Sequence, residues 1–319
     1  IGEIVLSTEK IHQLTGYAEK YLGKTGKYLM FGSVLLGFYG ALLAYVIGEG
    51  QALAALFGGS PVVFSLLFFA MASFLVYRGM ALVKRAEFFM TLIIFLIVFV
   101  IVFLGAPHLN WDYLQEFSWL KILIPYGVIF FAISGASAVP QLREVLPEQG
   151  KGIKQAIIWG TAIPFAIYLL FTLIVIGISG ANVTAVATIG LGQAVGEFMI
   201  IFGNLFAFFA MATSFLTLGL ALKATYIYDF KIIKNLAWLL TVSVPLIIFL
   251  SGYHNFVGVL GLAGALGGSI EGLLILLIVR RLKAKRDRIP EYQMLKSDWF
   301  LILLSLFFAG GIVYTLWHL

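Results

Sequence analysis

Phe130–Pro140 reads FFAISGASAVP and places small and hydroxyl-bearing residues in the middle of an otherwise apolar run. Hydrocarbon offers no water to free backbone groups, so a membrane helix can open only against protein or a water-filled cavity. If the helix opens at Ser134–Ser137, its free amides and carbonyls can hold a carboxylate, an ammonium or a cation, aided by two half-helix dipoles. The alternative is an unbroken helix whose small residues form a packing face. The sequence leaves both readings open.

Eight further apolar runs surround this one along the chain. A membrane-spanning helix needs about 20 mostly apolar residues, and the runs are continuously apolar rather than alternating, which argues against a transmembrane β-barrel. The sequence therefore predicts an all-α polytopic membrane protein with nine helices. The predicted helices are roughly Lys27–Gly48, Pro61–Tyr77, Ala86–Ala106, Leu120–Val139, Ile153–Ile178, Phe198–Ala221, Leu236–Ser251, Phe256–Val279 and Trp299–Leu316.

Composition excludes several classes of protein. Of the 319 residues, 61% are apolar and 11% are charged, whereas a soluble globular domain has roughly 45–50% and about 25%. A soluble enzyme and a disordered chain are both excluded. The absence of cysteine removes disulfides, thiolate metal sites and thiol nucleophiles. We expect no metal or cofactor and no membrane enzyme, because no catalytic triad, metal-ligand set or polar cluster in the loops can be assembled.

Basic residues predict the orientation in the membrane. All but one of the 21 Lys and Arg residues, the exception being Lys121, fall on the same side of the predicted helices. Cytoplasmic loops are enriched in Lys and Arg, so the N-terminus and the 280–296 loop are predicted to be cytoplasmic. The C-terminus and the Pro107–Trp119 loop are then external. We interpret the basic 280–296 run as a topology signal that contacts anionic lipid, not as a nucleic-acid site.

The acids Glu49 and Glu271 and the adjacent hydroxyls of Thr213 and Ser214 are polar groups within or beside the apolar runs. An intramembrane carboxylate is costly and usually functional, which makes Glu49 and Glu271 candidates for carrying a coupling proton. The alternatives are a helix end exposed to water for Glu49 and a structural partner within the bundle for Glu271. Thr213 and Ser214 could ligate a cation, or their hydroxyls could bond back to the preceding turn.

The eighth run also carries several glycines at spacings of one to three residues. With no preceding strand, they do not form a dinucleotide-binding fingerprint. We predict that they allow close helix packing. They are Gly258, Gly261, Gly264, Gly267 and Gly268.

Four stretches of this chain resemble, in order and topology, the aromatic amino acid permeases of the tryptophan/tyrosine permease type, within the amino acid–polyamine–organocation superfamily. They are Tyr17–Gly26 (YAEKYLGKTG), Ile124–Leu146 (IPYGVIFFAISGASAVPQLREVL), Gly160–Phe171 (GTAIPFAIYLLF) and Ala212–Phe230 (ATSFLTLGLALKATYIYDF).

The resemblance implies an inverted-repeat, leucine-transporter-like bundle of eleven helices. The nine predicted helices match its third to eleventh, and the apolar stub Ile1–Leu6 matches the end of its second. We therefore expect residues 1–319 to form a single transmembrane transporter domain that is N-terminally incomplete. It would comprise a cytoplasmic segment over residues 1–25 and nine membrane helices over residues 27–316.

The resemblance also implies roles for individual residues. Phe131, Ser134, Gly135 and Ser137 match the unwound centre of the sixth family helix, which lines the substrate pocket. Tyr45 matches a tyrosine that stands beside the substrate in many members of the superfamily.

The same comparison bears on the coupling ion. Thr213 and Ser214 match hydroxyls that hold a cation in sodium-coupled relatives. Permeases of this type are generally proton-coupled, so these hydroxyls do not by themselves imply sodium. The coupling ion is therefore H⁺ or Na⁺, with H⁺ favoured.

Together these features predict a secondary active transporter in the plasma (inner) membrane, importing amino acids by cation-coupled alternating access. Aromatic or other large neutral substrates follow from the resemblance, while Phe130, Phe131 and Tyr45 suit aromatic and leucine-like side chains equally. The expected partners are the amino acid and membrane lipids, with no nucleic acid. The alternative is a non-transporting membrane receptor or interaction subunit that keeps the transporter fold.

Overall fold

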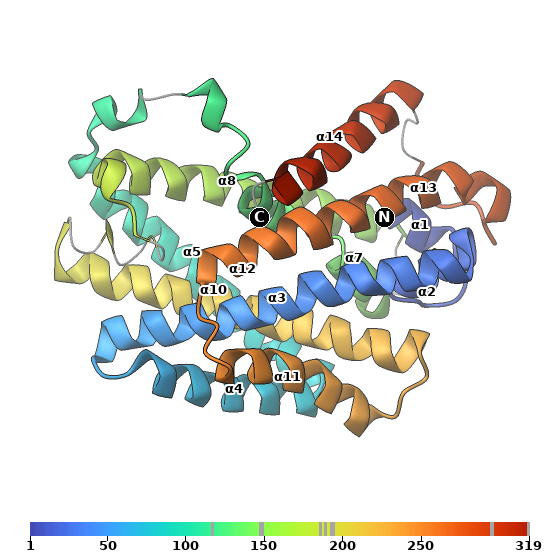
Figure 1. Ribbon diagram of the computed structural model, residues 1–319, viewed down its shortest axis with the longest axis horizontal. Coiled ribbons are helices and arrows are strands. Elements are labelled where there is room, and N and C mark those ends of the chain that lie inside the picture. The colour runs from blue at the N-terminus through green and yellow to red at the C-terminus, as the bar shows by residue number, and fades with distance from the viewer. Residues whose placement is uncertain are drawn as a thin grey trace.

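The computed structural model describes the chain apart from residues 116–117, 147–149, 185–186, 188–189, 192–194, 294–296 and 318–319. The described part is a bundle of helices with α3 passing through its centre (Figure 1). The principal helices are α1 (Gly2–Leu6), α2 (Leu14–Leu22), α3 (Lys24–Phe57), α4 (Pro61–Arg78), α5 (Met80–Gly105), α6 (Tyr126–Ile133), α7 (Ala138–Val145), α8 (Gly150–Ser179), α10 (Glu197–Ala224), α11 (Lys234–Leu250), α12 (Phe256–Leu262), α13 (Ser269–Lys285) and α14 (Asp298–Trp317).

The membrane character of the chain is confirmed. Seven helical spans in the described part are long and apolar enough to cross a bilayer: those of α3, α4, α5, α8, α10, α12–α13 and α14. The two other predicted runs correspond to α11, which has 17 residues, and to the pair α6 and α7, which have eight residues each. The count of nine membrane helices and the inverted repeat stay predictions.

The helix observed at the first predicted run is longer than the sequence indicated. The prediction ended it at Gly48, but α3 continues for nine more residues, as far as Phe57. The helix stops where Gly58 and Gly59 take positive φ values of 71° and 95°, a conformation that glycine adopts without steric cost. Gly48 has helical neighbours on both sides and does not end the helix.

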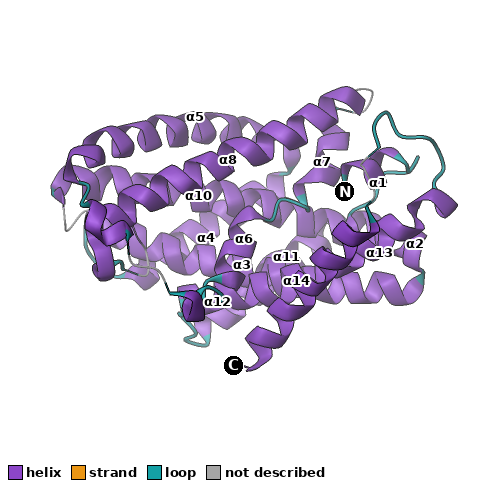
Figure 2. Ribbon diagram, turned by 90° about the horizontal axis from the view of Figure 1, so that it is seen from above, coloured by secondary structure: helices purple, strands orange, loops and turns teal. Residues whose placement is uncertain are grey.

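The bundle has inner and outer helices. In the most apolar window of each span, 56% of residues are buried in α3 and 50% in α10 and in α12–α13, against 11% in α14. α3 contacts α4, α10, α11 and α12, and α5 contacts both α8 and α10; in Figure 2, α5 lies at the edge of the bundle. The exposed apolar side chains of the outer helices therefore face the lipid.

The glycines between α12 and α13 allow close packing, as predicted. Between the two helices, Ala263–Gly268 form a π-helical turn, η6, that lies against α6 and α3. A methyl group on Gly264 would come within 1.9 Å of the carbonyl oxygen of Gly127 in α6. Ser33 Oγ of α3 donates a 2.6 Å hydrogen bond to the Gly267 carbonyl. This turn brings α13 close to both α3 and α6.

Hydrogen bonds at the basic end of the bundle link segments far apart in the sequence. The Asp229 carboxylate, beyond the end of α10, accepts hydrogen bonds from the Gly16 amide at 2.9 Å and from the Thr15 hydroxyl. Lys27 Nζ donates to the Asp229 carbonyl at 3.0 Å. A carboxylate on the free amides of a helix N-terminus stabilises that helix, so Asp229 fixes α2 against the end of α10.

Arg143 and Asp287 hold the residues before α2 at the same end. The Arg143 guanidinium, from α7, donates to the carbonyls of Val5, Thr8 and Glu9. Asp287, just beyond α13, forms an ion pair with Lys20 of α2 and accepts a 2.9 Å hydrogen bond from the Glu9 amide. The ends of α7, α10 and α13 thus meet around the N-terminal segment.

Candidate functional site

A central cavity of about 580 Å³ lies between the inner helices. Its walls come from α3, α5, α6, α7, α8, α10 and the α12–α13 region. Eight of the ten residues that the sequence singled out for a site line it, the exceptions being Glu49 and Phe130. The eight are Tyr45, Phe131, Ser134, Gly135, Ser137, Thr213, Ser214 and Glu271. The structure therefore brings together residues drawn from four separate predicted runs.

The interrupted helix forms one wall of the cavity. α6 ends at Ile133, α7 starts at Ala138, and the four residues between them are not helical. Of the two readings of the FFAISGASAVP segment, the broken helix is the one observed. Within the described part of the chain, the amides of Gly135, Ala136 and Ser137 make no hydrogen bond. They lie at the positive end of the α7 dipole, an arrangement that suits an anionic group.

Aromatic side chains face the cavity from three helices. Tyr45 of α3 and Phe131 of α6 have ring centroids 6.2 Å apart, and Tyr168 of α8 also contributes to the wall. Phe130 does not line the cavity, contrary to expectation. It packs against Phe308 of α14, with ring centroids 5.2 Å apart, because adjacent residues on a helix point about 100° apart.

The hydroxyls of α10 make mostly local hydrogen bonds. Thr213 Oγ1 and Ser214 Oγ both donate to the Ala210 carbonyl, at 2.9 and 2.8 Å. Of the two readings of these residues, back-bonding to the preceding turn is therefore observed. Each hydroxyl oxygen keeps lone pairs, and both residues face the cavity, so a role as cation ligands stays a prediction.

Glu87 is a cavity residue that sequence reasoning missed. It lies near the start of α5, lines the cavity and accepts a 2.5 Å hydrogen bond from Thr217 Oγ1 of α10. The prediction placed it as the second residue of the Ala86–Ala106 run, close to Lys84 and Arg85, and assigned it no role. The available signal was the spacing of Glu87 and Thr91, which places two polar residues one helical turn apart on one face.

The two predicted acids lie in different environments. Glu271 of α13 is 7% exposed and lines the cavity. Glu49 of α3 is fully buried, lies outside the cavity lining, and has no hydrogen-bond partner for either carboxylate oxygen within the described residues. The reading of Glu49 as a helix end exposed to water is therefore wrong, because α3 continues past it to Phe57.

The cavity has an acidic lining. Glu87 and Glu271 line it from α5 and α13, and its described lining contains no Lys, Arg or His. Free amides of the broken helix therefore share one space with two carboxylates and several aromatic rings. This arrangement can accommodate a zwitterion with an apolar side chain, together with a cation.

The sequence of the chain is similar to those of known transport proteins. The sequence profile of the tryptophan/tyrosine permease family matches residues 1–318. A Haemophilus influenzae protein described as tyrosine-specific transport system 1 is 28% identical over 301 residues, which cover 86% of this chain and 74% of that protein.

Proposed function

The chain belongs to the tryptophan/tyrosine permease family, and from that premise we propose that it imports an aromatic amino acid in symport with protons by alternating access. As a permease it is a multi-pass membrane transporter of amino acids and not an enzyme. The observation that carries the proposal is the central cavity beside the broken α6–α7 helix.

The broken helix supports recognition of the amino acid backbone. The amides of Gly135, Ala136 and Ser137 would receive the substrate carboxylate at the start of α7. The last carbonyls of α6, at the negative end of its dipole, would receive the ammonium group. Both groups of a zwitterion are then held by backbone atoms, so this part of the site does not discriminate between amino acids.

The aromatic side chains of the cavity wall would select among amino acids. Tyr45, Phe131 and Tyr168 offer aromatic surfaces to a substrate side chain, and paired aromatic rings gain about 0.5–1.5 kcal/mol beyond the area that they bury. The printed description of the Haemophilus influenzae relative concerns tyrosine. We therefore propose tyrosine or tryptophan in preference to leucine-like substrates.

The buried acid of α13 supports proton coupling. Glu271 of α13 lines the cavity, and the described lining contains no Lys or Arg that could neutralise its charge. A proton is therefore the simplest way to neutralise this carboxylate in the membrane. One charge moved through 100 mV releases about 2.3 kcal/mol, enough to concentrate a zwitterion roughly 50-fold. Thr213 and Ser214 offer the competing sodium site.

Orientation is part of the proposal. The basic end that carries α2 and the end of α13 would face the cytoplasm in the plasma membrane. A cysteine at Lys283 should resist an impermeant maleimide in intact cells, and one at Asn110 should react, against a background free of native thiols. Labelling at Lys283 but not at Asn110 would reverse the orientation.

Uptake into proteoliposomes tests the proposal as a whole. The full-length protein should accumulate radiolabelled tyrosine or tryptophan when the lumen is more alkaline than the medium. Accumulation should collapse with a protonophore and persist when choline replaces sodium. If the amino acid equilibrates without accumulating, transport is not coupled to protons. If there is no uptake at all, the protein does not transport these substrates.

A further inference from the structure

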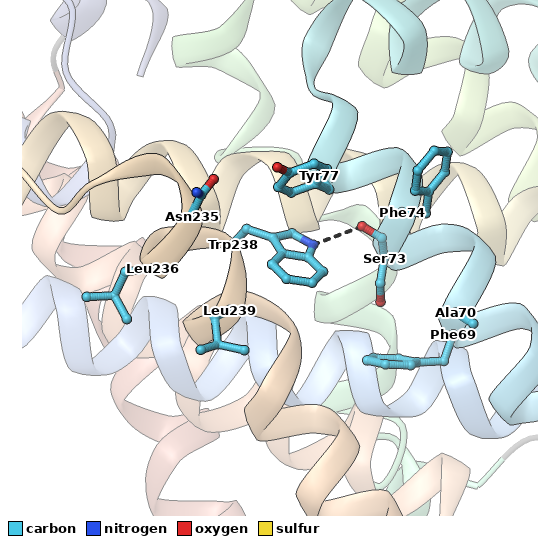
Figure 3. A pocket seen from close by; sticks show the side chains of 9 residues that line it. All are labelled: Phe69, Ala70, Ser73, Phe74, Tyr77, Asn235, Leu236, Trp238 and Leu239. Atoms are coloured by element: carbon cyan, nitrogen blue, oxygen red, sulfur yellow. Dashed lines mark hydrogen bonds between the residues drawn. The ribbon is translucent and has the colours of Figure 1, made fainter.

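A second cavity, of about 810 Å³, opens on the outside of the bundle between α4 and α11. Figure 3 shows its walls, with Phe69 and Phe74 on α4 and Trp238 and Leu239 on α11. Phe74 and Leu239 are about half exposed, so this groove faces the surroundings of the protein. It shares no lining residue with the central cavity and has no part in the proposed transport mechanism.

Contacts within the protein fix the Trp238 side chain in the wall of the groove. Trp238 Nε1 donates a 2.9 Å hydrogen bond to the Ser73 carbonyl, drawn as a dashed line in Figure 3. The Tyr77 and Trp238 rings meet edge to face with centroids 5.2 Å apart. Because the indole donor is already satisfied, Trp238 offers an apolar surface to whatever fills the groove.

One end of the groove is positively charged. α4 ends at Arg78 and α11 begins at Lys234, directly beside the lining residues Tyr77 and Asn235. Both basic residues are exposed. The Arg78 guanidinium lies over the Phe74 ring, 5.6 Å from its centroid, which places this charge at the groove wall.

No acidic residue offsets these charges from within either helix. The sequence contains no Asp or Glu from residue 50 to 86 or from residue 230 to 270. An apolar groove with a positive end at the membrane surface matches a molecule with a hydrocarbon chain and an anionic head.

We propose that this groove binds an anionic phospholipid. One acyl chain lies against Phe74 and Trp238, and the phosphate group contacts Arg78 and Lys234. A second copy of this chain fits the groove less well, because a symmetric contact uses the same patch on both partners. The positive ends of two such grooves would then be brought together without a negative partner.

Native mass spectrometry of the purified full-length protein tests the site. Dioleoylphosphatidylglycerol and dioleoylphosphatidylcholine are titrated separately in detergent, and bound lipids are counted. The protein should bind phosphatidylglycerol more tightly. Replacing two basic residues, as in Arg78→Gln with Lys234→Gln, should weaken that binding roughly 30-fold and leave phosphatidylcholine binding unchanged.

Matched variants separate a site from general surface charge. Arg281→Gln with Lys283→Gln removes two exposed charges at the same end of the bundle, outside the groove lining. This variant should preserve the tight binding of phosphatidylglycerol to the groove, because any contact of the 280–296 run with anionic lipid is a separate one. Ala70→Trp fills the groove from an exposed position and should abolish tight binding while the protein still elutes as a single species. Glycerol 3-phosphate, which lacks acyl chains, should not compete.

Three results would overturn the proposal. The first is equal affinity for the two lipids. The second is a loss of phosphatidylglycerol binding that is as large in the Arg281/Lys283 variant as in the Arg78/Lys234 variant. The third is a dimer that Ala70→Trp dissociates in the absence of added lipid, which would make a second copy of the chain the occupant.

Discussion

The ring centroids of Tyr45 and Phe131, which both line the central cavity, lie 6.2 Å apart, and the ring planes are inclined by 54°. Tyr45 belongs to α3, an unbroken 34-residue helix in the centre of the bundle, whereas Phe131 lies two residues before the end of the half-helix α6. A flat side chain that contacts both rings would therefore touch the rigid and the interrupted parts of the fold together. Under the proposed function, this pair would connect substrate binding to any movement of α6.

A bulky residue at Gly135 should block transport without unfolding the protein. A Cβ atom at this position would have no protein atom within 4 Å, so the side chain of Gly135→Phe would enter the cavity. We expect normal expression and a loss of tyrosine uptake of more than about 10-fold, since tenfold corresponds to only 1.4 kcal/mol of lost binding. Gly310→Phe is the control, because Gly310 also has open space around it but lies on α14. Normal uptake by the Gly135 variant would remove this segment from the site.

Gly264→Ala, by contrast, should lower the stability of the protein. Its methyl group would meet the Gly127 carbonyl at 1.9 Å and Phe131 Cβ at 2.8 Å. Relieving such overpacking costs about 1–3 kcal/mol, so the unfolding temperature in detergent should fall. Gly261→Ala is the matched variant, since its nearest neighbour, a Val128 methyl, is 3.9 Å away. Equal unfolding temperatures for the two variants would show that α6 and the η6 turn are less tightly packed than described.

Replacing Glu271 should remove the pH dependence of uptake. If this carboxylate carries the coupling proton, Glu271→Gln stays neutral throughout and cannot exchange a proton in each cycle. Uptake by this variant should not change with pH, whereas Glu49→Gln, outside the cavity lining, should keep the native pH profile. Glu87→Gln tests the other cavity carboxylate and should retain coupling. Sodium-dependent uptake by the native protein, with normal uptake by Glu271→Gln, would transfer coupling to a sodium site.

The contact between Lys20 and Asp287 should loosen in acid. The hydrogen bond from the Lys20 ammonium lowers the pKa of Asp287 below its ordinary value of 3.8. A lowered pKa contributes stability that is fully present above pH 3.8 and is lost as the pH falls through the folded-state value. Because the pair is exposed, the effect should be local.

Hydrogen exchange at Glu9 measures this local effect. The Glu9 amide donates to Asp287 Oδ2 at 2.9 Å, so its protection factor should fall below pH 3.8. In Asp287→Asn the protection should be low and independent of pH over the same range. Equal protection in both proteins would mean that the ion pair does not hold this segment.

The location of the helices could be predicted because hydrocarbon imposes a simple rule on sequence. Each spanning segment must be apolar and must satisfy its own backbone, so runs such as Phe198–Ala221 correspond closely to observed helices. The break before Ala138 could be predicted only as one of two readings, because small residues serve packing and unwinding equally well. Neighbouring helices decide between them, and they are not visible in one segment.

The site could be predicted only in part, because the sequence does not give the rotation of each helix or how far the cavity extends along it. Phe130 and Phe131 are equivalent in composition, but helix rotation directs one to α14 and the other into the cavity. Glu49 follows Tyr45 by one turn, yet the described lining from α3 does not extend to it. Glu87 was missed because basic neighbours mask an acid at the start of a helix.

Cysteine protection in the cavity tests most directly whether it binds the amino acid. The chain has no native cysteine, and Ala132 is an exposed residue of the cavity wall, so Ala132→Cys introduces a single thiol at the site. The account predicts that tyrosine at about 100 times its Kd slows maleimide labelling by up to about 100-fold. Glycine should have little effect, and labelling of Ser60→Cys, at the start of α4, should not change with either amino acid. Labelling of Ala132→Cys at the same rate with and without tyrosine or tryptophan would contradict the central claim.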